Sequence, residues 1–305
     1  MKIAKNELIN AIWPFIGRFV FLLIGLLAPA VVCQAEVIKS EIHTNGFVAN
    51  FYCDPNITNK FGILFLGGSE GGLPYPAPNL AAQGYPTLAL AYFKAPGLPE
   101  NLVSIPLEYF DKPIEWMQHN AHIPSTNIVV IGGSRGTELA LLLGSLKPAI
   151  RGVVAISPSS VVWGGIPKDI PTELPPSWTM GGKPLPYMPG CSNDFTSGVY
   201  HYFVLSLART NDVKRATIHV ENIRGPILLI SGQADALWPS AEMANAICER
   251  LKDTGFKYKY TNLVYKNAGH SFNPDHLIGG TIEGNREARI DLAKQILAFV
   301  DGIQN

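Results

Sequence analysis

The sequence predicts an α/β fold with a mostly parallel central sheet and helices on both of its faces. Short, continuously apolar runs recur along the chain, and stretches of helical composition separate them. Continuous apolar runs are typical of strands that are buried on both faces, as in parallel sheets. The connections between the runs are too irregular for a barrel of eight equal units.

The expected elements follow one another in a regular order. Residues 36–53 alternate enough for a leading pair of short strands, joined near Asn45-Gly46. Continuously apolar strands are expected after this pair at residues 63–66, 87–92, 128–131, 153–156 and 227–230, with a sixth candidate at 261–265. Helices are expected between them, near residues 107–120, 137–146, 241–254 and 286–301.

One stretch interrupts this alternation. Residues 161–198, called the insert below, contain seven prolines, several glycines and two tryptophans. A loop of this length inside a compact domain is usually functional, often as a lid. The alternative is a packed surface excursion, and the sequence leaves both interpretations open.

The composition predicts a single globular domain over residues 36–305. The chain has 305 residues, of which 47% are hydrophobic and 16% charged, so it is able to bury a sizeable core. Its 24 Lys and Arg balance 24 Asp and Glu, which argues against a nucleic-acid-binding protein. The expected partner is a small-molecule substrate, and the oligomeric state is left open.

The first 35 residues predict a secretory signal peptide. Three cations precede the apolar stretch at residues 19–28, and Cys33-Gln34-Ala35 then offers a cleavage site of the small-x-small type. Cleavage there would export the chain to the periplasm or the medium, with no stable membrane insertion afterwards. The alternative is an uncleaved anchor over residues 19–33, but Arg18 keeps the apolar run shorter than the ~17 residues that span a bilayer.

The cysteines predict neither a metal site nor a nucleophile. Removal of the signal would leave Cys53, Cys191 and Cys248, which allow at most one disulfide, and the pairing stays open. Their spacing contains no CxxC pair and no Cys/His cluster of the zinc type, so we expect no structural metal and no cofactor. None of them lies at a glycine-flanked turn after a strand.

The pentapeptide Gly-x-Ser-x-Gly occurs twice, at residues 67–71 and 132–136. In a nucleophile elbow, this pattern exposes the serine hydroxyl on a strained turn from a strand into a helix. The second copy follows the expected strand at 128–131 and continues directly into a helix former. The first continues into a proline-rich segment that cannot start a helix at once. Ser134 is therefore the candidate nucleophile.

The first copy predicts a different role. It follows an early strand, where an α/β-hydrolase carries the glycine-rich loop that binds the oxyanion. The backbone N–H groups near Gly68 and Ser69, together with that of Arg135, are expected to hold the developing negative charge. The alternative for this loop is a plain glycine turn.

Asp235 and His270 complete a candidate triad. Asp235 follows the expected strand at 227–230, and His270 follows the one at 261–265. The order Ser134, Asp235, His270 is that of the α/β-hydrolases, with each residue just past the carboxyl end of a strand. His270 would accept the Ser134 proton, and Asp235 would fix the tautomer of His270 and stabilise its imidazolium form.

Several segments resemble the C-terminal catalytic domain of acyl-CoA thioesterases and bile-acid-CoA:amino-acid N-acyltransferases. They are the elbow helix, the loop at 67–72, the LALAYF and LEYF segments at 88–93 and 107–110, Leu98-Pro99, and Gly232-Gln233-Ala234-Asp235 with Trp238 and Ser240. The resemblance covers residues 60–290 approximately. It implies an α/β-hydrolase fold of the dienelactone-hydrolase-like kind, a Ser/Cys-His-Asp triad at Ser134, His270 and Asp235, and acyl-thioester substrates.

The sequence thus supports three hypotheses. The leading one is a serine hydrolase that cleaves acyl thioesters such as acyl-CoA through an acyl-enzyme. The second is an exported carboxylesterase or dienelactone-hydrolase-like enzyme acting on oxygen esters, because the export signal separates the chain from cytosolic coenzyme A. The third is an inactive hydrolase fold that serves as a binding protein, which the intact triad disfavours.

Overall fold

The computed structural model describes residues 36–43, 45–56, 61–71, 77–120, 122–123, 127–169, 171–190 and 198–303. The expected signal peptide and Cys191 lie outside these residues. Cys53 and Cys248 are free thiols. The described residues contain no group of three or more His, Cys, Asp or Glu side chains that could hold a metal ion.

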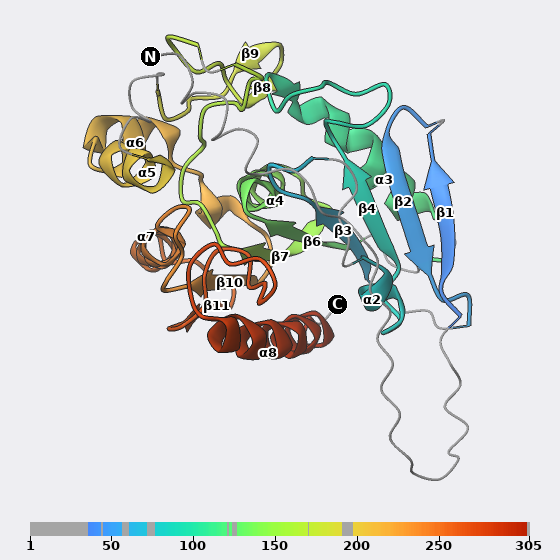
Figure 1. Cartoon of the computed structure of the whole chain (residues 1–305). Coiled ribbons are helices and arrows are strands. Elements are labelled where there is room, and N and C mark those ends of the chain that lie inside the picture. The colour runs from blue at the N-terminus through green and yellow to red at the C-terminus, as the bar shows by residue number, and fades with distance from the viewer. Residues whose placement is uncertain are drawn as a thin grey trace. The chain divides into compact units, whose positions relative to one another are not determined.

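Eight strands of the described chain form one large sheet, in the order β1-β2-β4-β3-β6-β7-β10-β11 (Figure 1). β2 pairs antiparallel with β1 and with β4, and the other neighbouring strands are parallel. The bounds are β1 (Ile38–Ile42), β2 (Val48–Cys53), β3 (Gly62–Leu66), β4 (Thr87–Ala91), β6 (Ile128–Gly133), β7 (Ile150–Ile156), β10 (Ile227–Gly232) and β11 (Tyr260–Tyr265). The predicted leading pair and the mostly parallel sheet are both confirmed.

Helices cover both faces of this sheet, as the sequence predicted (Figure 1). Side chains alternate along each strand, so Leu64 and Leu66 of β3 face α3, α4 and α7, while Ile63 and Phe65 face α2 and α8. The helix bounds are α2 (Ala77–Ala81), η1 (Leu107–Phe110), α3 (Asp111–His119), α4 (Arg135–Leu146), α5 (Val199–Leu207), α6 (Thr210–Ala216), η3 (Val220–Asn222), α7 (Ser240–Asp253) and α8 (Ile282–Asp301).

Helix α4 is the most deeply buried helix described. Every residue from Arg135 to Gly144 is buried, and the helix packs on β6, β7 and β3. Its apolar run Leu139–Leu143 therefore fills the space between the sheet and η3. This packing places the first residue of α4 directly beyond the carboxyl end of β6.

Several elements were not predicted from the sequence. They are α2, α5, α6 and a small sheet of β5 (Ile105–Pro106), β8 (Trp178–Met180) and β9 (Lys183–Pro184). In the small sheet, β5 pairs with β8, which lies about 70 residues further along the chain. A local sequence pattern therefore does not predict this pairing. Helix α5 has the sequence VYHYFVLSL, whose few polar positions give no amphipathic period.

The described part of the insert is packed against the rest of the domain. Trp163, Trp178 and Met188 are almost completely buried, and the N–H of Ser104 donates to the carbonyl of Pro176 at 2.8 Å. The N–H of Ile166 donates to the carbonyl of Leu102, also at 2.8 Å. These contacts favour the packed surface excursion over the lid.

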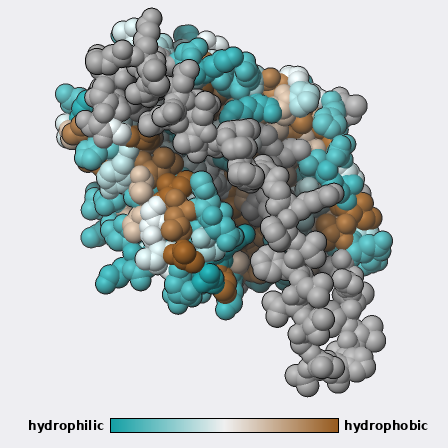
Figure 2. Space-filling view, in the orientation of Figure 1, coloured by the Kyte–Doolittle hydropathy of each residue, from teal (hydrophilic) through white to brown (hydrophobic). Residues whose placement is uncertain are grey.

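Hydrophobic residues reach the surface in separate areas among hydrophilic ones on the face shown in Figure 2. Exposed apolar side chains include Leu205 on α5 and Ile290 on α8. No helix in the described ranges has both the length and the apolar composition needed to cross a bilayer.

Candidate active site

Ser134 lies between β6 and α4 in a strained backbone conformation. Its φ is 52° and its ψ is −123°, a combination that residues with a side chain rarely adopt. This is the geometry expected of a nucleophile elbow.

The two outer glycines of the elbow are required by close backbone contacts. A Cβ atom at Gly132 would lie 2.2 Å from the carbonyl oxygen of Gly136, and one at Gly136 would lie 2.3 Å from the carbonyl oxygen of Gly67. Gly133, by contrast, has nothing within 4 Å of the corresponding position. The start of α4 therefore lies directly against the end of β3, and only glycine permits that approach.

The structure brings the three predicted triad residues together. His270 Nε2 lies 2.8 Å from Ser134 Oγ, and His270 Nδ1 lies 2.9 Å from Asp235 Oδ2. Asp235 follows β10 and His270 follows β11, so both loops leave the same edge of the sheet as the elbow. Asp235 and His270 are 8% and 6% exposed, which keeps most water from their hydrogen bond.

The hydrogen bonds of Asp235 determine the tautomer of His270. Its Oδ1 accepts the N–H groups of Leu237 and Trp238, and its Oδ2 accepts the hydroxyl of Ser240 at 2.6 Å. An ionised carboxylate only accepts, so His270 Nδ1 must carry the proton. The lone pair of Nε2 is then free to accept the proton of Ser134 Oγ.

Further contacts hold the His270 loop in place. The Ser157 hydroxyl donates to the carbonyl oxygen of His270 at 2.7 Å, and the N–H of His270 donates to the carbonyl of Ile278 at 2.8 Å. The Trp238 ring packs edge-on against the His270 ring, with 5.5 Å between centroids. Ser157 was not recognised from the sequence, although its position directly after β7 places it at the same sheet edge.

The first Gly-x-Ser-x-Gly copy forms a loop beside the elbow. The Cβ position of Gly68 lies 3.0 Å from Ser134 Cβ, so this loop lies where the sequence predicted oxyanion donors. The Gly68 N–H, however, donates to Glu70 Oε1 at 2.7 Å. Arg135 is the first residue of α4, so its N–H has no partner within the helix. The Gly68 N–H therefore has a hydrogen-bond acceptor within its own loop, whereas the Arg135 N–H has none within its own helix.

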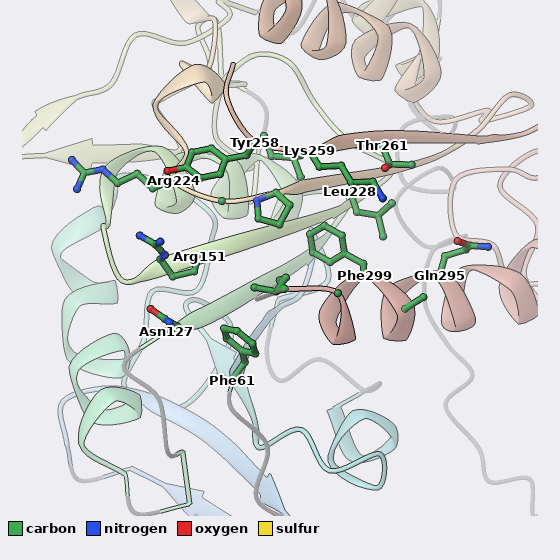
Figure 3. A pocket seen from close by; sticks show the side chains of 16 residues that line it. Phe61, Asn127, Arg151, Arg224, Leu228, Tyr258, Lys259, Thr261, Gln295 and Phe299 are labelled. Carbon is green, nitrogen blue, oxygen red and sulfur yellow. The ribbon is translucent and has the colours of Figure 1, made fainter. Parts of the chain in front are cut away.

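A separate cavity of about 460 Å³ lies at the amino ends of the parallel strands (Figure 3). Arg151, Arg224 and Lys259 surround it, and Phe61 and Phe299 contribute apolar walls. These residues precede or begin strands or belong to the end of α8, whereas the Ser134 site lies beyond the carboxyl ends of the strands. This cavity is therefore distinct from the candidate active site.

The sheet order, the strained serine and the histidine and aspartate beyond the next strands define an α/β-hydrolase fold. A family model described as "BAAT / Acyl-CoA thioester hydrolase C terminal" matches residues 105–277, more than half of the chain. The chain belongs to this family, which confirms the resemblance identified from its sequence segments.

Individual relatives agree with this assignment. The chain is 26% identical over 255 residues to acyl-coenzyme A thioesterase 1 of Homo sapiens, covering 78% of this chain and 59% of that protein. It is 32% identical over 234 residues to acyl-coenzyme A thioesterase 6 of Mus musculus, covering 75% of this chain and 52% of that protein. The chain thus spans little more than half the length of these curated relatives.

Solved structures support the fold. A putative dienelactone hydrolase from Klebsiella pneumoniae matches with a TM-score of 0.54 at 16% identity, covering 88% of this chain and 98% of that one. An esterase from Pyrococcus furiosus matches with a TM-score of 0.53 at 18% identity, covering 92% and 94%. At such low identity the likeness concerns the α/β-hydrolase fold alone.

The elbow contacts lead to a test with a matched control inside one motif. We expect Gly136→Ala to lower the free energy of unfolding by more than about 1 kcal/mol, because the new methyl group meets backbone that cannot move aside. Gly133→Ala should stay within about 0.5 kcal/mol of the parent, since its methyl group would enter open space. Urea unfolding of both variants measures the difference, and equal stabilities would contradict the contact.

Proposed function

We propose that the protein is a serine hydrolase that cleaves acyl thioesters, such as acyl-CoA, through an acyl-enzyme on Ser134. The observation that carries this proposal is the continuous chain of contacts from Ser134 Oγ through His270 to Asp235. Membership of the acyl-CoA thioester hydrolase family favours thioesters over oxygen esters as the main substrates.

In the first half-reaction, Ser134 Oγ attacks the carbonyl carbon of the thioester while His270 Nε2 takes the hydroxyl proton. Asp235 stabilises the imidazolium that forms. When the tetrahedral intermediate collapses, the carbon–sulfur bond breaks, and the proton passes from His270 to the departing sulfur. The products of this half are a free thiol and an acyl ester of Ser134.

In the second half-reaction, water replaces the thiol. His270 takes a proton from the water as its oxygen attacks the acyl carbon, and the collapse of the second intermediate returns that proton to Ser134 Oγ. A free carboxylic acid leaves. No metal or organic cofactor takes part in this scheme.

The oxyanion of both intermediates needs donors beside Ser134. The N–H of Arg135 at the start of α4 is the first, and the N–H of Ser69 in the neighbouring loop is the second. The N–H of Gly68 becomes a third donor only when the Glu70 carboxylate moves away from it. The side chain of Ser69 has no role in this scheme.

The two serines therefore give opposite predictions. Ser134→Ala should lower kcat by a factor on the order of 10⁶, as loss of a triad nucleophile does, while the protein stays folded. Ser69→Ala should retain most of the activity, because only its backbone takes part. Steady-state hydrolysis of acyl-CoAs of several chain lengths measures both. An inactive Ser69→Ala beside an active Ser134→Ala would reverse the roles of the two loops.

The fate of the acyl group gives a second prediction. An oxygen ester on Ser134 is less reactive toward amines than a thioester would be, and water activated by His270 is plentiful. With an acyl-CoA and millimolar glycine or taurine, we expect mostly free acid and free thiol, with some turnover of short p-nitrophenyl esters alongside. Product analysis dominated by N-acyl amino acid would contradict hydrolysis, and turnover of oxygen esters without any thioester would favour the esterase alternative.

We further propose that the chain is exported and loses its first 35 residues. The proposal rests on the cations, the apolar stretch at 19–28 and the small residues before Glu36. N-terminal sequencing of the protein from its native cells should begin near Glu36. Intact Met1 in the membrane fraction would instead favour an anchor over residues 19–33.

A further inference from the structure

The side chain of Arg135 runs from the elbow into the insert. It is 5% exposed, and its Nη2 donates to the carbonyl oxygens of Trp163 at 3.3 Å and Gly164 at 3.1 Å. The same nitrogen donates to Ser177 Oγ at 2.5 Å, and that hydroxyl donates in turn to the carbonyl of Trp163. The insert thus binds the side chain of Arg135, while the backbone N–H of the same residue is a proposed oxyanion donor.

Glu138 lies one turn further along α4 and completes this network. Its side chain is fully buried, with Oε2 3.3 Å from Arg135 Nη1 and Oε1 accepting the indole N–H of Trp178 at 2.5 Å. Trp178 packs on the ring of Tyr92 with 5.7 Å between centroids. The Tyr92 hydroxyl donates to the carbonyl of Gly67 at 2.6 Å. One carboxylate therefore connects the elbow helix, the insert and the oxyanion loop.

The stability of the fold alone does not explain a carboxylate here. Position 138 is within a helix whose next residues are apolar and buried, and a buried ion pair is often no more stabilising than apolar side chains of similar size. The pair is also incompletely satisfied, because Arg135 Nε and Glu138 Oε2 have no hydrogen-bond partner among the described residues. Such a network is better explained by positioning than by stability.

Glu138 is able to change its charge near neutral pH. Burial raises its pKa to about 7, against the opposing effects of the Arg135 charge, the Trp178 indole N–H and the backbone N–H of Trp163. Two further titratable groups face the network: Tyr92, directly after β4, and Glu70, whose charge acts on Tyr92. Burial raises the pKa of Tyr92 far above its usual value, so Tyr92 stays neutral throughout.

We propose that Glu138 is a positioning residue of the hydrolase, whose ionised carboxylate holds Arg135 and Trp178 and thereby keeps the Arg135 N–H aimed at the oxyanion. When the carboxylate takes up a proton, a buried charge disappears and the fold as a whole becomes more stable, but the attraction for the guanidinium is lost, the Arg135 N–H is less well aimed, and kcat falls. This inference rests on the proposed function of the Ser134 site. It adds the ionisation of Glu138 to the pH dependence of the reaction.

The first test compares Glu138→Gln with Glu221→Gln. A glutamine side chain has the shape of a protonated glutamate, so we expect Glu138→Gln to lower kcat for an acyl-CoA about 10-fold or more at pH 8, while KM changes less. Below neutral pH, log kcat of the parent should fall more steeply with decreasing pH than that of the variant, by up to one unit of slope, because only the parent carries the Glu138 carboxylate. Glu221 pairs with Arg250 far from Ser134 along the chain, and its removal should change neither kcat nor the slope.

Stability gives a readout independent of activity. Because the Glu138 pKa is raised in the folded state, its contribution to stability is complete below its ordinary value of 4.5 and is lost as the pH rises through about 7. The Tm of the parent should therefore fall relative to that of Glu138→Gln between pH 5 and 8. The pKa of Glu221 is lowered to about 2, so the Tm difference caused by Glu221→Gln should stay constant over this range.

A spectroscopic titration needs no change at position 138. In a Ser134→Ala background, the fluorescence of Trp178 should report the protonation of Glu138 as a transition near pH 7. The transition should be absent when Trp178→Phe is added, and its presence there would assign it to another tryptophan and overturn the inference. Absence of any transition between pH 6 and 8 in Ser134→Ala would also overturn it, even where Glu138→Gln does not fold.

The outcomes separate this inference from the proposed function. If the parent hydrolyses thioesters and Glu138→Gln keeps its kcat and its slope, the inference is wrong and the proposed function remains. If the parent hydrolyses neither thioesters nor oxygen esters and a fluorophosphonate does not label Ser134, the proposed function fails. The positioning role then fails with it.

Discussion

The approach of the α4 backbone to the end of β3 is the constraint on which the rest of the site depends. The Cβ position of Gly136 is only 2.3 Å from the carbonyl oxygen of Gly67, so helix and strand touch through backbone alone. Beside this contact, Ser134 has a positive φ, and Arg135 is the first residue of the helix, where its N–H has no intrahelical acceptor. The contact also brings the Gly67–Gly71 loop beside the serine. The candidate nucleophile and the proposed oxyanion donors therefore lie beside one backbone contact.

The parallel sheet supplies the remaining geometry. Because the carboxyl ends of parallel strands meet at one edge, the loops after β10 and β11 reach the elbow from neighbouring strands. Asp235 is fixed by two N–H groups of its own loop and by the hydroxyl of Ser240 at the start of α7. His270 is fixed by Asp235 and Ser157. A large buried sheet thus holds three short loops rigidly relative to one another. Because these groups are already in place, hydrogen-bond donors beside Ser134 need not reorganise when charge develops on a bound substrate.

The sequence predicted those features that depend on local pattern. Continuous apolar runs identified the buried strands, and a glycine-flanked serine between a strand and a helix identified Ser134. It did not predict the small sheet of β5, β8 and β9, because that sheet depends on pairing between distant segments with only two or three residues in each strand. The buried contacts of Glu138 were missed for a similar reason. The one visible signal was a glutamate entering the buried apolar run of α4, and its partner Trp178 is 40 residues away.

The two Gly-x-Ser-x-Gly copies show why the surroundings of a motif decide its chemistry. Their sequences, GGSEG and GGSRG, differ only in the residue after the serine. After Ser69, the Glu70 carboxylate turns back to its own loop and binds the Gly68 N–H at the surface. After Ser134, the Arg135 side chain is buried in the insert, where its charge needs the partner that Glu138 provides. Among the described residues, the exposed Glu70 bonds only to its own loop, so it does not fix that loop to the rest of the domain. The buried Arg135 pairs with Glu138 and bonds to the insert, so it fixes the elbow to the rest of the domain. The second copy is for this reason the better support for a nucleophile, and the first is suited to a role that its backbone performs.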